Sequence, residues 1–142
     1  MEKKCVLIYD DDVEILNVCK AILHTSNYRV ETIQTCENIV SDILAFKPDI
    51  VFADVLLTKR NGYEVCQDLK NDVDTKDLPV VLMWSGFMEI DEAKIAQATA
   101  RLEKPFDAEA LRKQSHFLGH RSRTQKIDLH LSGRSHKTIS LR

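Results

Sequence analysis

The 142-residue sequence lacks the patterns that direct a protein into or across a membrane. No apolar stretch approaches the ~20 residues that a membrane-spanning helix needs. The N-terminus, Met1 to Lys4, leads into an apolar run without a signal-peptide pattern. Internal repeats of solenoid length and low-complexity runs are also missing. We therefore expect a cytoplasmic protein with one main domain.

Close cysteine pairs are missing as well. The four cysteines, Cys5, Cys19, Cys36 and Cys66, stand singly, without the short spacings of zinc or redox motifs. Because free cysteine is among the most buried residue types, we predict four buried thiols.

The net charge of −2 conceals an asymmetry. Residues 1–111 carry 12 Lys/Arg and 21 Asp/Glu, a net charge of −9. Residues 112–142 carry 8 Lys/Arg and a single acid, Asp128, a net charge of +7. The two parts therefore differ in kind.

Apolar periodicity predicts strands and helices in alternation. Short, nearly continuous apolar runs predict buried strands at about residues 4–9, 49–55 and 78–85. Alternating residues at about 28–33 predict a strand at the sheet edge, and residues 101–104 are predicted as a short fifth strand. Apolar residues at helical spacing predict helices at about residues 12–23, 36–46, 62–71, 90–100 and 107–116. Five βα units favour an α/β fold with a doubly wound five-stranded parallel sheet, strand order 2-1-3-4-5, and helices on both faces.

Acidic residues follow two of these strands. Asp54 ends the run that begins at Ile50, and Asp10, Asp11 and Asp12 follow the first strand. In the order 2-1-3-4-5 these strands are neighbours, so the carboxylates meet at one edge of the sheet. Such a cluster repels itself unless a cation or a proton intervenes. An acidic run can also simply stabilise a helix N-terminus.

Five features stand in order at the expected strand ends and their following loops: Asp10-Asp11, Asp54, Gly62, Ser85 and Lys104-Pro105-Phe106. Together they resemble the receiver domain of two-component response regulators, of the chemotaxis-receiver type, over residues 4 to about 117. The resemblance implies a flavodoxin-like fold. Gly62 is needed for a turn.

The resemblance also implies a function. Asp54 would accept a phosphoryl group from a sensor histidine kinase or a phosphotransfer protein, and the signal would pass through a protein surface to a downstream protein or output domain. Lys104 and Ser85 would contact the phosphoryl oxygens. A carboxylate nucleophile that forms an acyl phosphate fits Asp54. The resemblance thus implies a self-phosphorylating receiver rather than an enzyme that turns over a substrate.

Mg²⁺ is the cofactor that the resemblance implies. It prefers about six oxygen ligands and keeps several waters. Asp11 and Asp54 as direct ligands, Asp10 through water and the Leu56 carbonyl would suit it.

Two residues depart from the family pattern. Thr58 stands where the family commonly has proline. Arg101 stands where the family generally has an aromatic residue that turns inward on activation. Because arginine keeps its charge, we expect Arg101 to stay outward. The segment 98–103 is also shorter than usual and lacks the usual glycine.

The resemblance ends near residue 117, so we divide the chain into a receiver domain, 1–117, and a basic tail, 118–142. Lys126 to Leu131 and Lys137 to Leu141 alternate apolar and polar residues, which predicts a β-hairpin. The tail is then a linker, or the start of a β-rich output domain. Its basic charge would also suit nucleic acid or an acidic partner.

Two alternatives remain open at this point. One is a pseudo-receiver, an interaction module of the same fold that phosphate does not switch. The other is a phosphatase of the haloacid-dehalogenase type, with Asp10 as nucleophile and Asp12 as acid. The phosphatase interpretation requires Thr or Val at position 14, where this chain has Glu14, and it leaves Asp54 without a role.

Overall fold

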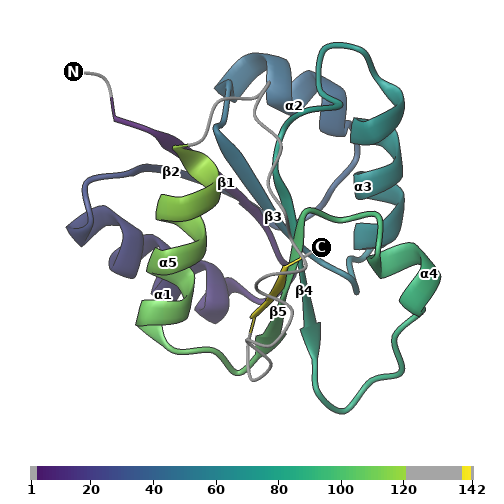
Figure 1. Cartoon of the computed structure of the whole chain (residues 1–142). Coiled ribbons are helices and arrows are strands. Elements are labelled where there is room, and N and C mark those ends of the chain that lie inside the picture. Colours follow the sequence, from purple (N-terminus) through teal and green to yellow (C-terminus); the bar gives the residue numbers. More distant parts are fainter. Residues whose placement is uncertain (1–2, 121–138, 142) are drawn as a thin grey trace.

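The computed structural model describes residues 3–120 and 139–141. In these residues strands and helices alternate from β1 to α5, and one further strand follows (Figure 1). The strands are β1 (Cys5–Tyr9), β2 (Arg29–Ile33), β3 (Ile50–Asp54), β4 (Val80–Ser85), β5 (Ala100–Lys104) and β6 (Ile139–Leu141). The helices are α1 (Val13–Thr25), α2 (Ile39–Phe46), α3 (Gly62–Asn71), α4 (Glu92–Ile95) and α5 (Ala108–Gly119).

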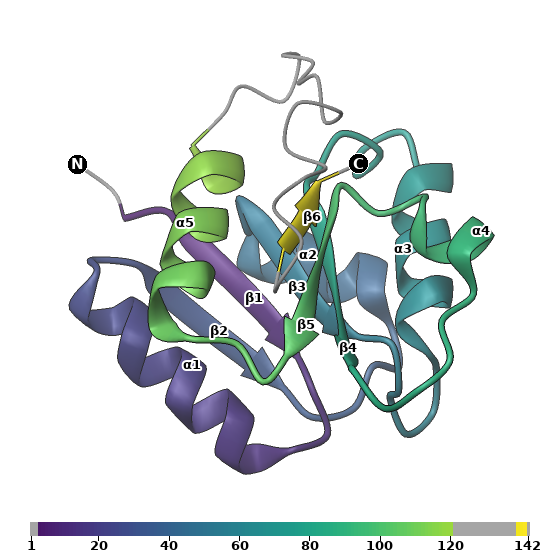
Figure 2. The ribbon, with the colours of Figure 1, turned by 60° about the horizontal axis from the view of Figure 1, so that its bottom comes forward.

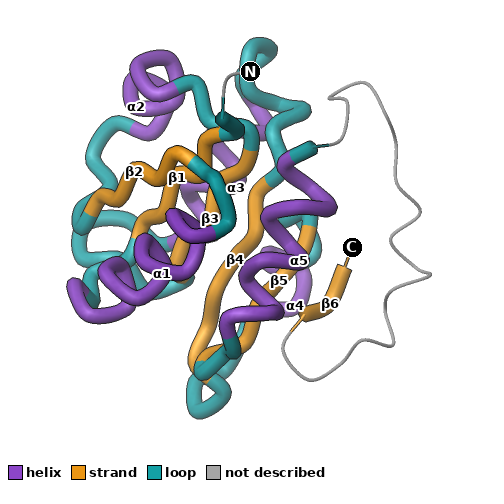
Figure 3. Tube along the Cα trace, turned by 90° about the vertical axis from the view of Figure 1, so that its left-hand side faces the viewer, coloured by secondary structure: helices purple, strands orange, loops and turns teal. Residues whose placement is uncertain are grey.

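The strands form one sheet in the order β2-β1-β3-β4-β5-β6. The first five are parallel to their neighbours, which confirms the predicted order 2-1-3-4-5. The sixth strand, which the sequence predicts as half of a hairpin, pairs antiparallel with β5 (Figure 3). Ser140 lies opposite Arg101 in this register. The other half of the predicted hairpin, Lys126 to Leu131, lies outside the described residues.

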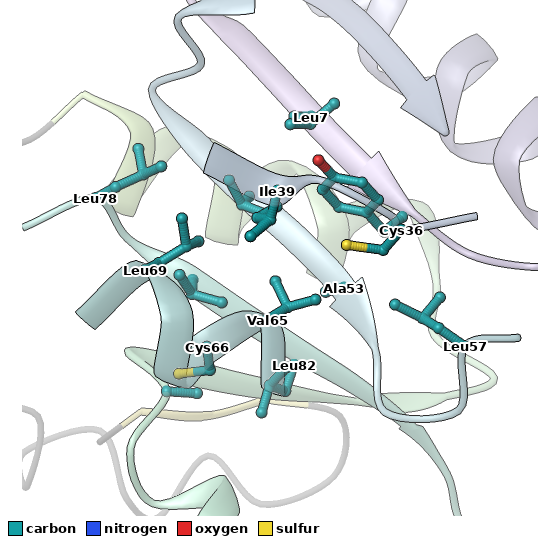
Figure 4. Packing of buried hydrophobic residues seen from close by; sticks show 14 of the residues in the cluster. Leu7, Cys36, Ile39, Ala53, Leu57, Val65, Cys66, Leu69, Leu78 and Leu82 are labelled. Carbon is teal, nitrogen blue, oxygen red and sulfur yellow. The ribbon is translucent and has the colours of Figure 1, made fainter. Parts of the chain in front are cut away.

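Helices cover both faces of the sheet, α1 and α5 on one side and α2, α3 and α4 on the other (Figure 2). Strand β1 serves both layers, because successive side chains of a strand point to opposite faces. Val6 and Ile8 pack with α1 and α5, whereas Leu7 and Tyr9 pack with α2 and α3. Figure 4 shows the second of these clusters. Each fully buried aliphatic side chain contributes about 1.5–3 kcal/mol relative to an exposed one.

Polar caps fix where the helices begin. Asp12, the predicted cap of α1, accepts a hydrogen bond from the backbone N–H of Glu14 at 2.9 Å. Asn38 caps α2, so that helix begins at Ile39 rather than at residue 36. Asn61 and Glu64 form a capping box at the start of α3, in which each side chain accepts from the other's backbone N–H.

The predicted fourth helix, residues 90–100, is wrong in its extent, because α4 covers only Glu92–Ile95. Thr99 is drawn out of the helix by the start of β4. Its N–H donates to the carbonyl of Val80 at 2.8 Å, and its Oγ1 accepts from the N–H of Val80 at 3.0 Å. The apolar residues after α4 therefore lead into β5 and do not continue the helix.

All four cysteines are free and buried, as predicted. Burial raises the pKa of the Cys19 thiol to about 12 and that of Cys66 to about 11, so both stay protonated at neutral pH. In the part of the chain that the structure describes, each helix is too short or too polar to cross a lipid bilayer.

Candidate functional site

The carboxyl ends of three strands place charged side chains at one edge of the sheet. Asp54 is the last residue of β3, Lys104 is the last residue of β5, and Asp10 directly follows β1. Strands β1 and β3 are neighbours, with Tyr9 opposite Ala53. The predicted meeting of Asp10 and Asp54 follows from this parallel register.

Lys104 lies between the two carboxylates. Its Nζ donates to Oδ2 of Asp10 and to Oδ2 of Asp54, both at 2.6 Å. The side chain of Asp10 is 1% exposed, that of Asp54 13% and that of Lys104 15%. One positive charge thus serves two largely buried negative charges, and the trio keeps a net charge of −1.

The shared charge affects proton binding. Burial raises the pKa of Asp54, and the negative charge of Asp10 acts in the same direction, while the hydrogen bond from Lys104 opposes both. Burial by itself lowers the pKa of Lys104, but the hydrogen bonds to Asp10 and Asp54 outweigh it and the pKa is raised. Lys104 is therefore firmly cationic, and the raised pKa means that Asp54 takes up a proton more readily than an ordinary aspartate does.

Asp11 and Asp12 have different roles from Asp10. Oδ1 of Asp11 accepts a hydrogen bond from the backbone N–H of Thr58 at 3.2 Å. Thr58 occupies the position where the family commonly has proline, and proline has no N–H to give. Asp12 caps α1 and its N–H donates to Oδ1 of Asp10 at 2.9 Å. Its capping role leaves the phosphatase reading, with Asp12 as acid, without support.

The loop after β3 folds tightly around Asp54. The N–H of Leu56 donates to Oδ1 of Asp54 at 3.2 Å, and the N–H of Gly62 donates to the carbonyl of Val55 at 2.9 Å. A Cβ on Gly62 would lie 2.5 Å from the carbonyl oxygen of Asp54. Gly62 has a negative φ, so glycine is required here by close packing and not by the turn conformation that the sequence suggests.

Ser85 ends β4 directly opposite Lys104 of β5. Its Oγ accepts a hydrogen bond from the N–H of Phe87 at 3.4 Å, so the hydroxyl holds its own loop in this arrangement. The preceding Trp84 carries a buried indole N–H that has no hydrogen-bond partner among the described residues. Trp84 is the single tryptophan of the sequence and is followed directly by Ser85.

A cavity of about 380 Å³ opens beside Lys104 and Ser85. Most of its lining is apolar and comes from α1 and the loops after β4 and β5. Apolar lining residues are Ile15, Val18, Phe87 and Phe106. Phe87 is 99% exposed, so its ring stands at the mouth of this cavity.

Arg101 does not lie in an apolar slot. Its Nη1 donates to Oε2 of Glu92 in α4 at 3.0 Å, and the Arg101 side chain is 19% exposed. The predicted outward orientation of Arg101 in the activated form stays a prediction. The structure adds a partner that the sequence does not reveal, because Glu92 is nine residues away.

The oxygen-rich donor set of Asp10, Asp11 and Asp54 fits Mg²⁺ by its chemistry. Within residues 3–120 and 139–141, however, no group of three or more Asp, Glu, His or Cys side chains is arranged to hold a metal ion. Lys104 donates to both Asp10 and Asp54 in this arrangement. The predicted ligand set, which includes the Leu56 carbonyl, therefore stays a prediction.

Comparison with known proteins identifies the family to which this chain belongs. The family model described as the response regulator receiver domain matches residues 6–116. The chain is 36% identical over 112 residues to the DNA-binding dual master transcriptional regulator RpaA of Synechocystis sp., covering 75% of this chain and 45% of that protein. It is 27% identical over 108 residues to protein PilG of Pseudomonas aeruginosa, covering 75% and 80%.

The chain thus spans less than half the length of RpaA and most of PilG. Among solved structures, the chemotaxis response regulator CheY4 of Vibrio cholerae superposes with a TM-score of 0.71 at 23% identity, covering 82% of this chain and 99% of that one. This likeness shows the fold. The family match shows more: the chain belongs to the receiver-domain family of two-component response regulators.

Proposed function

We propose that Asp54 accepts a phosphoryl group from a histidine kinase or a phosphotransfer protein in the cytoplasm. The observation that carries this proposal is the position of Lys104, whose Nζ lies 2.6 Å from both Asp54 and Asp10. A cation fixed beside a strand-end carboxylate is placed to stabilise negative charge that arrives on that carboxylate.

The reaction makes one bond and breaks another. A carboxylate oxygen of Asp54 attacks phosphorus, a new O–P bond forms, and the bond from phosphorus to the donor nitrogen breaks. The donor imidazole keeps the bonding electron pair and takes up a proton. Lys104 then pairs with a phosphoryl oxygen, because a charged hydrogen bond is worth about 1.5–3 kcal/mol.

Ser85 supplies a second, weaker contact. For the Ser85 hydroxyl to donate to a phosphoryl oxygen, the loop held by its bond to the Phe87 N–H must shift. A neutral hydrogen bond adds only about 0.5–1.5 kcal/mol. The two contacts together fall short of the roughly 5.5 kcal/mol that moves an equilibrium from 1:99 to 99:1. The switch is therefore partial.

Mg²⁺ completes the proposed site. Asp11 and Asp54 would hold it directly, Asp10 through water, and the Leu56 carbonyl would provide a further oxygen. When bound, the ion neutralises charge on the transferring phosphoryl group. The Asp11 carboxylate already accepts a hydrogen bond from the N–H of Thr58 through Oδ1, at 3.2 Å.

Access to the site suits a donor side chain. The cavity beside Ser85 and Lys104 measures about 380 Å³ and is lined mainly by apolar residues. An approaching partner would bury Phe87, which is almost fully exposed. The output is a downstream protein or an output domain.

Intact mass measurement tests the proposal. Incubation with a small phosphodonor and Mg²⁺ should add the mass of one phosphoryl group to the wild-type chain and none to Asp54→Asn. Asp77→Asn, which changes an exposed acid elsewhere, is the matched control and should gain the mass normally. A normal gain in Asp54→Asn would refute the assignment, and no gain in the wild type would support the pseudo-receiver.

Magnesium binding is tested separately through Trp84 fluorescence. Asp11→Asn should weaken Mg²⁺ binding sharply, since it removes one of the charged ligands. Asp12→Asn, which keeps a capping side chain, serves as the control and should bind as the wild type does. An Asp11→Asn titration that matches the wild type would remove Asp11 from the site.

A further inference from the structure

A second cavity lies at the opposite end of the sheet from Asp54. It measures about 690 Å³, within the range of about 300–1,000 Å³ that is usual for small-molecule sites. Its walls come from the segment before β1, the start of β2, the second half of α1 and the loop between α2 and β3.

Basic residues dominate the lining of this cavity. Lys3, Lys20, Arg29 and Lys47 line it, and Asp49 is the one acidic residue there. This composition is unusual for the region, because residues 1–111 carry a net charge of −9 with only 12 Lys/Arg. A third of those cations thus surround a single cavity in an otherwise acidic domain.

Asp49, the acidic residue of the cavity, already has hydrogen-bond and ion-pair partners. Oδ2 of Asp49 accepts a hydrogen bond from the N–H of Cys5 at 2.8 Å, and its Oδ1 lies 3.8 Å from Nζ of Lys4. Arg29 is held in place, since its Nη2 donates to the carbonyl of Phe46 at 2.7 Å. Its Nη1 lies 3.5 Å from Glu31.

The three lysines differ from Arg29. Lys3, Lys20 and Lys47 form no ion pair with any residue in the part of the chain that the structure describes. Cations near a helix C-terminus are stabilised by the helix dipole within its last turn. Lys47 is the C-cap of α2 and can benefit from this effect, but Lys20 precedes the last turn of α1 and Lys3 lies on no helix.

We propose that this cavity binds a small anion with several phosphate charges, of the di- or triphosphate class. Such an anion matches the excess of three positive charges in the lining, and its size matches a concave site rather than a flat surface. Free polyphosphate and the phosphate chain of a nucleotide share this chemistry. The proposal is independent of Asp54, since the cavity and Asp54 lie at opposite ends of the sheet.

The test is a titration of the full chain by two-dimensional NMR without Mg²⁺, which keeps the acidic site out of the experiment. The probes are sodium tripolyphosphate, ATP and inorganic sulfate. Tripolyphosphate should shift the amide signals of Cys5, Arg29 and Lys47 at concentrations at which sulfate does not. If ATP binds as tightly as tripolyphosphate, the cavity recognises the phosphates alone. If ATP binds more tightly, the cavity also contacts the nucleoside.

Charge reversal locates the site. The double variant Lys20→Glu/Lys47→Glu should lose at least tenfold in affinity, whereas Lys76→Glu/Lys113→Glu, with the same change in net charge, should lose much less. Lys20→Gln/Lys47→Gln should give an intermediate loss and covers the case in which the glutamates disturb folding. Equal losses in the two double variants, or signal shifts confined to the basic residues after 120, would overturn the proposal.

Discussion

The two ends of the sheet handle like charges in opposite ways. At the carboxyl end, Asp10 and Asp54 share the ammonium group of Lys104 through contacts of 2.6 Å. At the other end, Lys3, Lys20 and Lys47 line one cavity, and none of the three forms an ion pair with a residue that the structure describes. A cluster with an internal counter-charge is partly compensated, while one without such a partner favours an external ion.

Lys104→Ala should make the acidic end resemble the basic one. The change removes the ammonium group that contacts both Asp10 and Asp54. Asp10, which is 1% exposed, is then left beside a second carboxylate without that cation. Removing one partner of a buried ion pair costs about 3–5 kcal/mol of the free energy of unfolding. Urea denaturation at pH 7 measures it, and Lys113→Ala, which breaks an exposed pair with Glu109, is the control. Equal losses in both variants would contradict the structural role of Lys104.

Gly62→Ala tests how tightly the acidic end is packed. The new Cβ would lie 2.5 Å from the backbone oxygen of Asp54, which cannot move freely. Overpacking of this kind costs about 1–3 kcal/mol. Gly86→Ala is the matched control, because its Cβ meets the flexible end of the Glu103 side chain. Thermal unfolding compares the two, and a larger loss for Gly86→Ala would refute the packing argument.

Asp54→Asn sharpens the charge comparison. Burial raises the pKa of Asp54 in the folded state, so the folded chain binds this proton more tightly than the unfolded chain. The ionised carboxylate therefore lowers stability, an effect that grows as pH rises from 3.8 through the raised pKa. The variant should be more stable than the wild type at pH 7, and the difference should shrink as pH falls. A difference that widens in acid would reverse the sign.

Thr58→Pro removes the N–H that holds Asp11. Freed from this donor, Oδ1 of Asp11 should bind Mg²⁺ a few-fold more tightly, as followed by Trp84 fluorescence. Thr58→Val keeps the N–H and a similar side-chain shape, so its affinity should match the wild type. Weaker binding in the proline variant would mean that the Thr58 N–H positions Asp11 rather than competing for it.

Arg101→Gln should have the smallest effect. The Arg101 pair with Glu92 includes a glutamate that is 67% exposed, and such pairs contribute about 0–1 kcal/mol. Urea denaturation in low and high salt would measure it, with the wild-type advantage smaller in high salt. A loss above this range would show that Arg101 anchors α4.

Much of the fold could be predicted from residues that act locally in the sequence. The strand ends, the α1 cap at Asp12 and the meeting of Asp10 with Asp54 follow from apolar runs and parallel order. The short α4 could not be predicted, because Thr99 is held by a hydrogen bond to Val80 from another strand.

The site itself divides in the same way. Residue types place Asp54 and Lys104 at one edge, but no pattern indicates that Lys104 bridges both carboxylates. The basic cavity could not be predicted from the sequence, because Lys3, Lys20, Arg29 and Lys47 are not adjacent along the chain. Only the folded sheet brings them to one place.

Strand β6 has a consequence for how the protein behaves among its own copies. An uncovered edge strand offers unpaired backbone groups to any neighbouring chain, and this is a common route to aggregation. β6 pairs with Ala100, Arg101 and Leu102 of β5, and in the described part of the chain this edge strand has three residues. Very short edge strands are poor templates for further pairing. The strand that carries Lys104 is thereby shielded from intermolecular association along most of its length.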